Sequence, residues 1–127
     1  MGNTINIYYH RRANKYLNKL GKNEKTKLMV FINSKIQDFI KKKDRRYIYQ
    51  EKYFSKLGKF DSTIYYLKIS NDSMAIISID EDPIFEETTV TIYTICKHDK
   101  LRFEIQSIME SLYQKMINDD AYDEGDE

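Results

Sequence analysis

The sequence predicts a single α+β domain, in which an N-terminal strand and a helical hairpin pack on a small antiparallel sheet and a further helix ends the fold. Two kinds of apolar spacing predict this class, because stretches of period two, typical of strands, are separated by stretches of period 3.6, typical of helices. The chain has 127 residues, 41% of them hydrophobic, which allows one modest core and leaves no room for a second.

The first part of the chain is predicted to form one strand and two helices. Apolar and polar residues alternate over 4–9, as in a half-buried strand. Over 11–20 the apolar positions lie three and four residues apart on one helical face, and Gly21 stands where a left-handed residue would end the helix. Asn23 can cap a second helix that runs to about Lys41. The short connector between the helices predicts an antiparallel hairpin.

The second part is predicted to form three strands and a last helix. The charged and aromatic stretch 41–59 reads as a loop or short helix over one edge of the sheet. Strands are expected at 63–70, 74–80 and 88–97, with a tight turn at 71–73 and a longer loop around Asp82-Pro83. Asp99 can cap a final helix from Lys100 to about Ile117, which carries another apolar stripe. Helices on one face of hairpin-linked strands complete the expected fold.

The charge is divided unevenly along the chain. The full sequence has 21 basic and 20 acidic side chains, but six of the acids lie in residues 119–127. Residues 1–118, the predicted domain, therefore carry 21 basic against 14 acidic side chains. A basic body indicates a polyanion-binding surface, and the acidic residues 119–127 are interpreted as a disordered, solubilising tail. A second hypothesis is that this tail covers the basic surface in cis.

The sequence gives no sign of a cofactor, a metal or a membrane segment. Cys96 is the single cysteine and, with His10 and His98, cannot supply a structural zinc site. No apolar run approaches the roughly 20 residues that cross a bilayer. The start lacks the apolar stretch of a signal peptide, and a lone cysteine fits a reducing compartment, so we expect a cytoplasmic protein without a cofactor.

Three segments, taken in their order, carry a resemblance to a known family. The first is Tyr-Tyr-His-Arg-Arg-Ala-Asn-Lys-Tyr-Leu-Asn-Lys-Leu at 8–20, the second combines Phe-Ser-Lys-Leu at 54–57 with Ile-Tyr-Tyr-Leu-Lys-Ile at 64–69, and the third is Ile-Cys-Lys-His-Asp at 95–99. Together they resemble the RelE/ParE superfamily of bacterial toxin–antitoxin toxins. The resemblance extends over about residues 5–113.

The chain departs from the family pattern at positions where nuclease members carry functional residues. Met74 stands where those members usually have arginine on the strand, and it cannot hold a phosphate. Cys96 replaces the glycine before the basic pair, and the loop Asp80-Glu81-Asp82-Pro83 is longer and more acidic than in short members. These differences affect the implied activity more than the implied fold.

The resemblance implies a metal-independent cleavage of mRNA, in which a ribose 2′-hydroxyl attacks the neighbouring phosphate. Such a reaction needs a proton acceptor, a cation near phosphorus and an acid for the leaving 5′-oxygen. On that basis Lys68 and Lys97 would stabilise phosphate, His98 would be the acid or base, and Tyr66 would stack on a base or transfer a proton. The implied catalytic residues are Lys68, His98 and Tyr66, and the implied RNA-binding residues are Lys97, Lys56, Lys59, Arg45, Arg46 and Arg102.

Each of these residues also has a purely structural interpretation. Lys68 can be a solvated charge, His98 can bond to a helix cap, and the packing of Tyr66 on the sheet is the favoured interpretation for that residue. Arg45 and Arg46 are interpreted either as non-specific phosphate contacts or as exposed loop residues. The lysines of the two predicted helices are interpreted as a solvated face: Lys19, Lys22, Lys25, Lys27 and Lys35.

Two functions stay open at this point. The first is an endoribonuclease toxin that acts on translated mRNA at the ribosome. The second is a non-catalytic binding module, either a ParE-like inhibitor of DNA gyrase or an inactive protein-binding member, and Met74 favours this second function. Both imply a cognate antitoxin as partner, which would wrap an extended segment around the basic groove.

Overall fold

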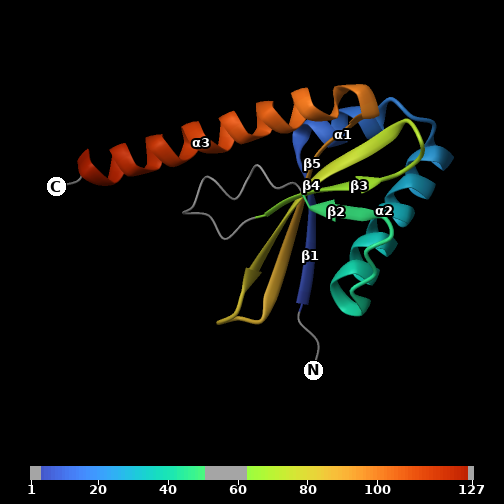
Figure 1. Cartoon of the computed structure of the whole chain (residues 1–127), viewed down its shortest axis with the longest axis horizontal. Helices are drawn as coiled ribbons and strands as arrows, with labels where there is room; N and C mark the ends of the chain where they lie inside the picture. Colours follow the sequence, from blue (N-terminus) through green and yellow to red (C-terminus); the bar gives the residue numbers. More distant parts are fainter. Residues whose placement is uncertain (1–3, 51–62, 126–127) are drawn as a thin grey trace.

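The structure, a computed structural model, describes residues 4–50 and 63–125, and these form a five-stranded sheet with three α-helices. The α+β class is confirmed. Figure 1 shows the sheet at the centre, with α3 passing across it and continuing beyond it. In chain order the elements are β1 (Thr4–Tyr9), α1 (Arg11–Asn18), α2 (Lys22–Lys42), β2 (Ile48–Gln50), β3 (Thr63–Lys68), β4 (Ser73–Asp82), β5 (Glu87–Lys97), the 3₁₀ helix η2 (His98–Lys100) and α3 (Leu101–Gly125).

The sheet is mixed, so the expectation of an antiparallel sheet is wrong for one pair of strands. The strand order is β1-β5-β4-β3-β2. β1 pairs with β5 in parallel, whereas the other three pairs are antiparallel. Hairpin connections force antiparallel pairing, but the long connection between β1 and β5 leaves either direction open. The sequence pattern of β1 shows that one face is buried and contains no information about its partner strand.

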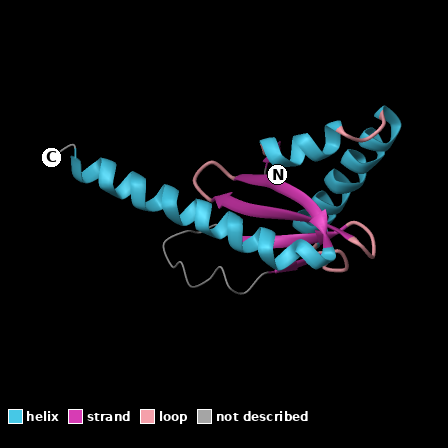
Figure 2. Ribbon diagram, turned by 90° about the horizontal axis from the view of Figure 1, so that it is seen from above, coloured by secondary structure: helices cyan, strands magenta, loops and turns pink. Residues whose placement is uncertain are grey.

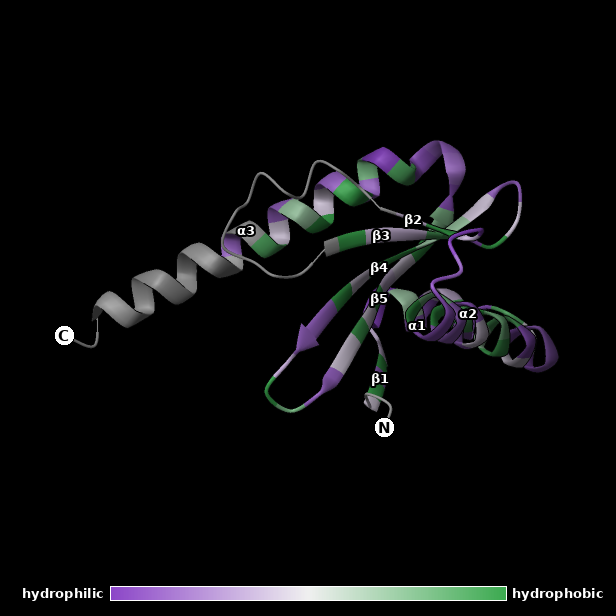
Figure 3. Cartoon of the chain, turned by 60° about the horizontal axis from the view of Figure 1, so that its bottom comes forward, coloured by the Kyte–Doolittle hydropathy of each residue, from purple (hydrophilic) through white to green (hydrophobic). Residues whose placement is uncertain are grey.

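The helices cover both faces of the sheet, not one face as expected. Figure 3 shows α1 and α2 on one side of the sheet and α3 on the other, and Figure 2 shows the same layers from above. Alternate residues of the strands feed two separate cores, because successive side chains of a strand point to opposite faces. The core under α1 and α2 contains Ala13, Leu17, Ile32, Ile36, Ile48, Leu67, Ala75, Ile77, Ile79, Val90, Ile92 and Ile95. The smaller core under α3 contains Ile64, Ile76, Ile105 and Ile108.

Strand β4 is the central element and is buried on both faces from Met74 to Ile79. Its pairing with β5 shifts register between Ile76 and Ile77, so that Ile76 faces Thr94 and Ile77 faces Ile92. Tyr93 is the extra residue on β5, as in a β-bulge. Its ring packs against the core under α3. Tyr93 lies on the α3 side by its alternation with Ile92, and the bulge shifts the later alternation so that Ile95 returns to the core under α1 and α2.

Several helix ends differ from the predicted ones. α1 ends at Asn18 with Lys19 as a right-handed C-cap, so Gly21 does not end it in a left-handed conformation. Gly21 instead precedes α2 as its N-cap with φ −62°, and helix α2 begins at Lys22, ahead of the expected cap Asn23. The left-handed residue of this region is Lys43, the C-cap of α2. Short polar residues at the α1–α2 junction offer several stopping points, and tertiary packing selects among them.

The later elements also differ in detail. The stretch predicted as a loop or short helix contains strand β2, which pairs with β3. Asp99 lies inside η2 and does not cap α3. α3 does not end near Ile117 but continues to Gly125, so acidic residues after position 118 extend this helix. The interpretation of 119–127 as a separate tail stays a prediction.

Candidate functional site

Lys68 and Tyr66 lie on the α3 side of the sheet. Ile64 of the same strand belongs to the core under α3, and Tyr66 and Lys68 follow it at intervals of two residues. Lys68 is exposed and Tyr66 is half-buried. The ring of Tyr66 stacks on that of Tyr49 from β2, with centroids 5.3 Å apart and an interplanar angle of 27°. This stack gives Tyr66 a packing role, and Tyr49, which is 40% exposed, offers an open aromatic face.

His98 and Lys97 stand at the end of β5, at the same end of the sheet as Lys68. Lys68 pairs with Met74, and Met74 pairs with Cys96, so Lys68 and Cys96 are two strand spacings, or roughly 10 Å, apart. Lys97 follows Cys96 and alternates toward the opposite face. His98 opens η2, is exposed, and its backbone N–H donates to the carbonyl of Asp72 at 2.7 Å. The topology brings Lys68 and His98 to one end of the sheet but gives them different orientations.

Between them lies Met74, which is 4% exposed. The side chain is therefore part of the packed interior and offers no cation between Lys68 and Cys96. Cys96 is half-buried, and burial raises the pKa of its thiol to about 11, so the thiol is protonated at neutral pH.

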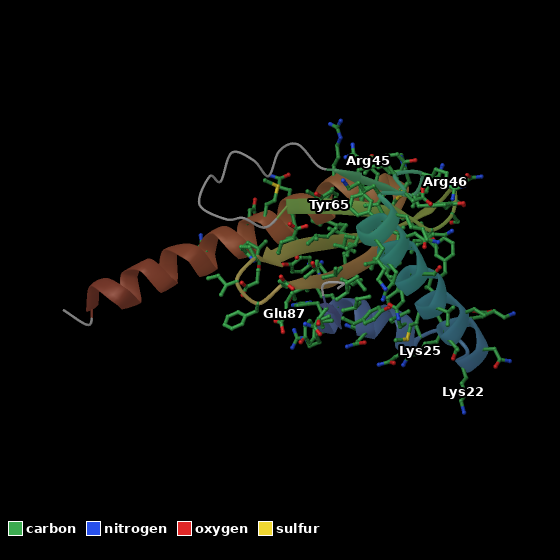
Figure 4. All side chains as sticks on the ribbon, turned by 90° about the horizontal axis from the view of Figure 1, so that it is seen from below. Lys22, Lys25, Arg45, Arg46, Tyr65 and Glu87 are labelled. Atoms are coloured by element: carbon green, nitrogen blue, oxygen red, sulfur yellow. The ribbon has the colours of Figure 1, made fainter. Side chains whose placement is uncertain are left out.

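The predicted RNA-binding residues are spread over the molecule. Arg46 is held by Asp44 in a bidentate pair, with Nη2 to Oδ2 at 2.8 Å and Nε to Oδ1 at 3.0 Å. This pairing lowers the pKa of Asp44 to about 2, and it balances the charge of Arg46. Figure 4 shows Arg45 and Arg46 at one end of α2 and Lys22 at its other end. Arg102 is exposed in the first turn of α3, and Lys56 and Lys59 lie outside the described residues, as does the segment 54–57.

A cleft that the sequence did not predict lies between the start of α1, the middle of β5 and α3. Its volume is about 380 Å³. It is lined by His10, Arg12, Thr91, Tyr93, Ile108, Ser111 and Leu112. These residues come from three separate parts of the chain, so no local motif marks them. The run His10-Arg11-Arg12 is the sequence signal nearest to it, and it lies within the segment 8–20 that resembles the toxin family.

The polar groups of this cleft are held in defined positions. His10 is the N-cap of α1, and its Nδ1 accepts a hydrogen bond from the backbone N–H of Arg12 at 3.2 Å. Because Nδ1 is an acceptor, the proton of the neutral ring is on Nε2. The Nη2 of Arg12 donates to Oε2 of Glu104 at 2.6 Å, which fixes the guanidinium beside α3. The pair joins α1 to the first turns of α3.

Tyr93 supplies a hydroxyl to the same cleft. Ser78 Oγ donates to the phenol oxygen at 3.3 Å, which leaves the phenol proton free to be donated to another group. Burial raises the pKa of Tyr93, so this hydroxyl is neutral at neutral pH and acts as a donor. The His10 and Tyr93 rings lie with centroids 6.0 Å apart and tilted by 46°. The arrangement places an imidazole, a guanidinium and a phenol around one opening.

A shallow groove on α1 adjoins the cleft at Arg12. It has a volume of about 660 Å³ and is lined by Arg11, Arg12, Asn14, Lys15, Asn18 and Lys19. The lining has four cations and no carboxylate. The buried residues Ala13 and Leu17 anchor the opposite face of the helix, so the cations point away from the core. Of the helical lysines expected on a solvated face, Lys19 belongs to this cationic strip, and the other four lie on α2.

Comparisons with protein-family models, with curated proteins and with solved structures give no match for this chain. Within residues 4–50 and 63–125, no helix has the length and apolarity needed to cross a membrane. In the same part of the chain, no three histidine, cysteine or acidic side chains gather as a metal site would require.

Proposed function

We propose that the chain is a toxin of the RelE/ParE type that cleaves mRNA on the ribosome. The observation that carries this proposal is the position of Lys68 and His98, 30 residues apart in sequence, at the same end of the sheet. The resemblance of the segments at 8–20, 64–69 and 95–99 supports it, as does the cationic strip on α1, which suits a polyanion. The proposed partners are mRNA, the ribosome and a cognate antitoxin.

The proposed reaction is a transfer within the RNA strand. The 2′-oxygen forms a bond to phosphorus, the bond from phosphorus to the 5′-oxygen breaks, and the products are a 2′,3′-cyclic phosphate and a free 5′-hydroxyl. His98 would accept the 2′-proton or protonate the 5′-oxygen, and Lys68 would stabilise the additional negative charge on the phosphate oxygens. The stacked Tyr49 and Tyr66 would hold a base next to the scissile bond.

The test is expression of the chain in a bacterial host, with growth and translation as readouts. The double variant Lys68→Ala/His98→Ala should restore growth, and the purified variant should cut ribosome-bound mRNA at least about a hundredfold more slowly, since general acid–base groups contribute that much. The matched control is Lys22→Ala/Lys41→Ala, which removes two exposed positive charges from the two ends of α2. Equal toxicity of the double variant and the wild type would remove Lys68 and His98 from the mechanism.

A second candidate function is non-catalytic inhibition of DNA gyrase, as in ParE-like toxins. Buried Met74, where nuclease members of the resembled family carry arginine, favours it. A supercoiling assay with purified gyrase separates the two functions. Inhibition of supercoiling together with intact ribosome-bound mRNA would replace the nuclease proposal by this one, and cleavage of mRNA without any effect on supercoiling would exclude it.

A further inference from the structure

The cleft between α1, β5 and α3 is separate from the end of the sheet where Lys68 and His98 lie. Its floor is formed by Thr91 and Tyr93 of β5 and its wall by α3. Tyr66 and Lys68 belong to β3, on the far side of β4. The Ile76 side chain of β4 packs with Ile105 and Ile108 of α3 and closes the space between the two regions. The cleft is therefore a second site on the α3 side of the sheet.

The polar lining of the cleft suits one anionic group. Arg12 carries a permanent charge, and of its five N–H donors only one has a hydrogen-bond acceptor within the described residues, the Glu104 carboxylate. His10 adds the Nε2–H donor, and the hydroxyls of Thr91, Tyr93 and Ser111 add three more. No carboxylate is among the seven lining residues. A guanidinium with several hydroxyl donors is the chemistry that binds a phosphate.

The rest of the lining suits a flat aromatic ring. Ile108 and Leu112 of α3 form an apolar wall, and the rings of Tyr93 and His10 stand at its side. Aromatic faces and apolar side chains bind a nucleobase by stacking and burial. The volume of about 380 Å³ is at the small end of the range for ligand sites, which runs from roughly 300 to 1,000 Å³.

We propose that this cleft binds one nucleotide, with its phosphate on Arg12 and His10 and its base between Tyr93 and the apolar wall of α3. Glu104 is a positioning residue, because its carboxylate accepts from Nη2 of Arg12 at 2.6 Å and so orients the guanidinium. The proposal does not depend on cleavage of RNA and does not involve Lys68 or His98.

The nucleotide can come from a free nucleotide or from an RNA strand, and the chemistry at the cleft is the same. The cationic strip continues from Arg12 along α1 through Lys15 to Lys19. It provides phosphate contacts on one side of the cleft, which a single nucleotide does not need. This continuity favours a nucleotide within a strand.

The experiment measures fluorescence anisotropy with two probes, a short single-stranded RNA labelled with fluorescein and AMP labelled with a methylanthraniloyl group. Arg12→Ala is compared with Arg11→Ala, which removes the same charge from the neighbouring position and lines only the outer strip. Arg12→Ala should raise the dissociation constants of both probes by about tenfold or more, because it removes charge-assisted hydrogen bonds. Arg11→Ala should leave AMP unchanged and weaken RNA by less than about threefold.

Ser111→Trp provides a variant that keeps the Arg12–Glu104 pair and fills the cleft from its exposed rim on α3. It should also raise the dissociation constants of both probes by about tenfold. Thermal unfolding followed by circular dichroism checks that each variant is folded. If the wild type binds the RNA probe but not AMP, and both cleft variants lose this binding, the natural ligand is an RNA strand. If the wild type binds AMP as tightly as RNA, the natural ligand is a free nucleotide. Equal effects of Arg11→Ala and Arg12→Ala with no effect of Ser111→Trp, or failure of both probes to bind, would overturn the proposal.

The Lys68→Ala/His98→Ala variant keeps this test independent of the proposed cleavage. It should bind AMP as the wild type does, because AMP would occupy the cleft alone. Loss of binding in this variant, with normal binding in Ser111→Trp, would move nucleotide recognition to the end of the sheet and contradict the cleft proposal.

Discussion

The two faces of the sheet differ in what their side chains do. The face under α1 and α2 is sealed by twelve buried apolar residues from both helices and four strands. Among the described residues, the core under α3 has four buried apolar residues, and Ser78, Tyr93, Tyr66 and Lys68 lie on the same face. The cleft lined by Ile108, Ser111 and Leu112 opens along the described part of this helix. The first face therefore provides most of the stability, and the second contributes Lys68, Tyr66 and Tyr93, which the two proposals combine with the cations of α1.

The bulge in β5 contributes to this difference. Tyr93 faces α3 by its alternation with Ile92, and the extra residue lets Ile95 join Ile92 in the core on the other side. Without the extra residue, Ile95 would point to the α3 side with Tyr93. A local irregularity of one strand thus keeps Ile95 in the larger core beside a strand that presents a phenol to α3.

The largest expected effect is a difference in stability between the two faces. Ile77→Ala should lower the free energy of unfolding by about 2–5 kcal/mol, because Ile77 is fully buried in the larger core and its neighbours cannot fill the cavity. Ile108→Ala should cost about 2 kcal/mol, since Ile108 borders the cleft and water can enter the space left behind. Urea unfolding of both variants measures the difference. A larger loss of unfolding free energy in Ile108→Ala than in Ile77→Ala would contradict the conclusion that the face under α1 and α2 provides most of the stability.

A smaller effect is expected at alkaline pH from a tyrosine on the α1–α2 side. Burial raises the pKa of Tyr9 from its ordinary value of 10.0 to about 12. The unfolded chain therefore loses this proton first, so the contribution of Tyr9 to stability is complete below pH 10 and is lost as the pH rises to 12. The loss should be about 1 kcal/mol, because the half-buried phenol is partly screened by water. The measurement is urea unfolding as a function of pH.

Tyr9→Phe should flatten this pH dependence, at a cost of about 1 kcal/mol at neutral pH for the lost hydrogen bond from the phenol to Asn33 Oδ1. The control is Tyr8→Phe, since Tyr8 is 58% exposed on the other face. It should leave both the neutral stability and the pH dependence unchanged. Equal pH dependence in Tyr9→Phe and the wild type would show that burial of Tyr9 does not control alkaline stability.

The sequence predicted the elements better than their arrangement. The apolar periods located β1, α1, α2, β3, β4, β5 and α3, because each period reflects a face that is buried in the fold. The unbroken apolar run from Met74 to Ile79 carried one more signal, since a strand without polar alternation is covered on both faces. It would have predicted a helix on each side of the sheet. β2 was missed because only three residues pair, within a stretch rich in charge.

The candidate sites were predictable only in part. Lys68 and His98 were expected at the exposed side of the sheet, and the register places them at one end of it. The cleft depends on the parallel pairing of β1 with β5, which brings His10 to Ile92, where its backbone N–H donates to the carbonyl at 2.8 Å. It also depends on the side of the sheet that α3 covers. Neither of these two features is encoded in a local pattern of residues.

The measurement that tests the division of the two faces most directly is a nuclear magnetic resonance titration of the ¹⁵N-labelled chain with unlabelled single-stranded RNA. The largest shifts should occur at the amides of Thr91, Tyr93 and Ser111, which line the cleft on the α3 side. The amides of Ile32 and Ile36, which lie in the core under α2, should not move. Largest shifts along α2, with the cleft residues unchanged, would contradict the assignment of the α3 side as the ligand-binding face.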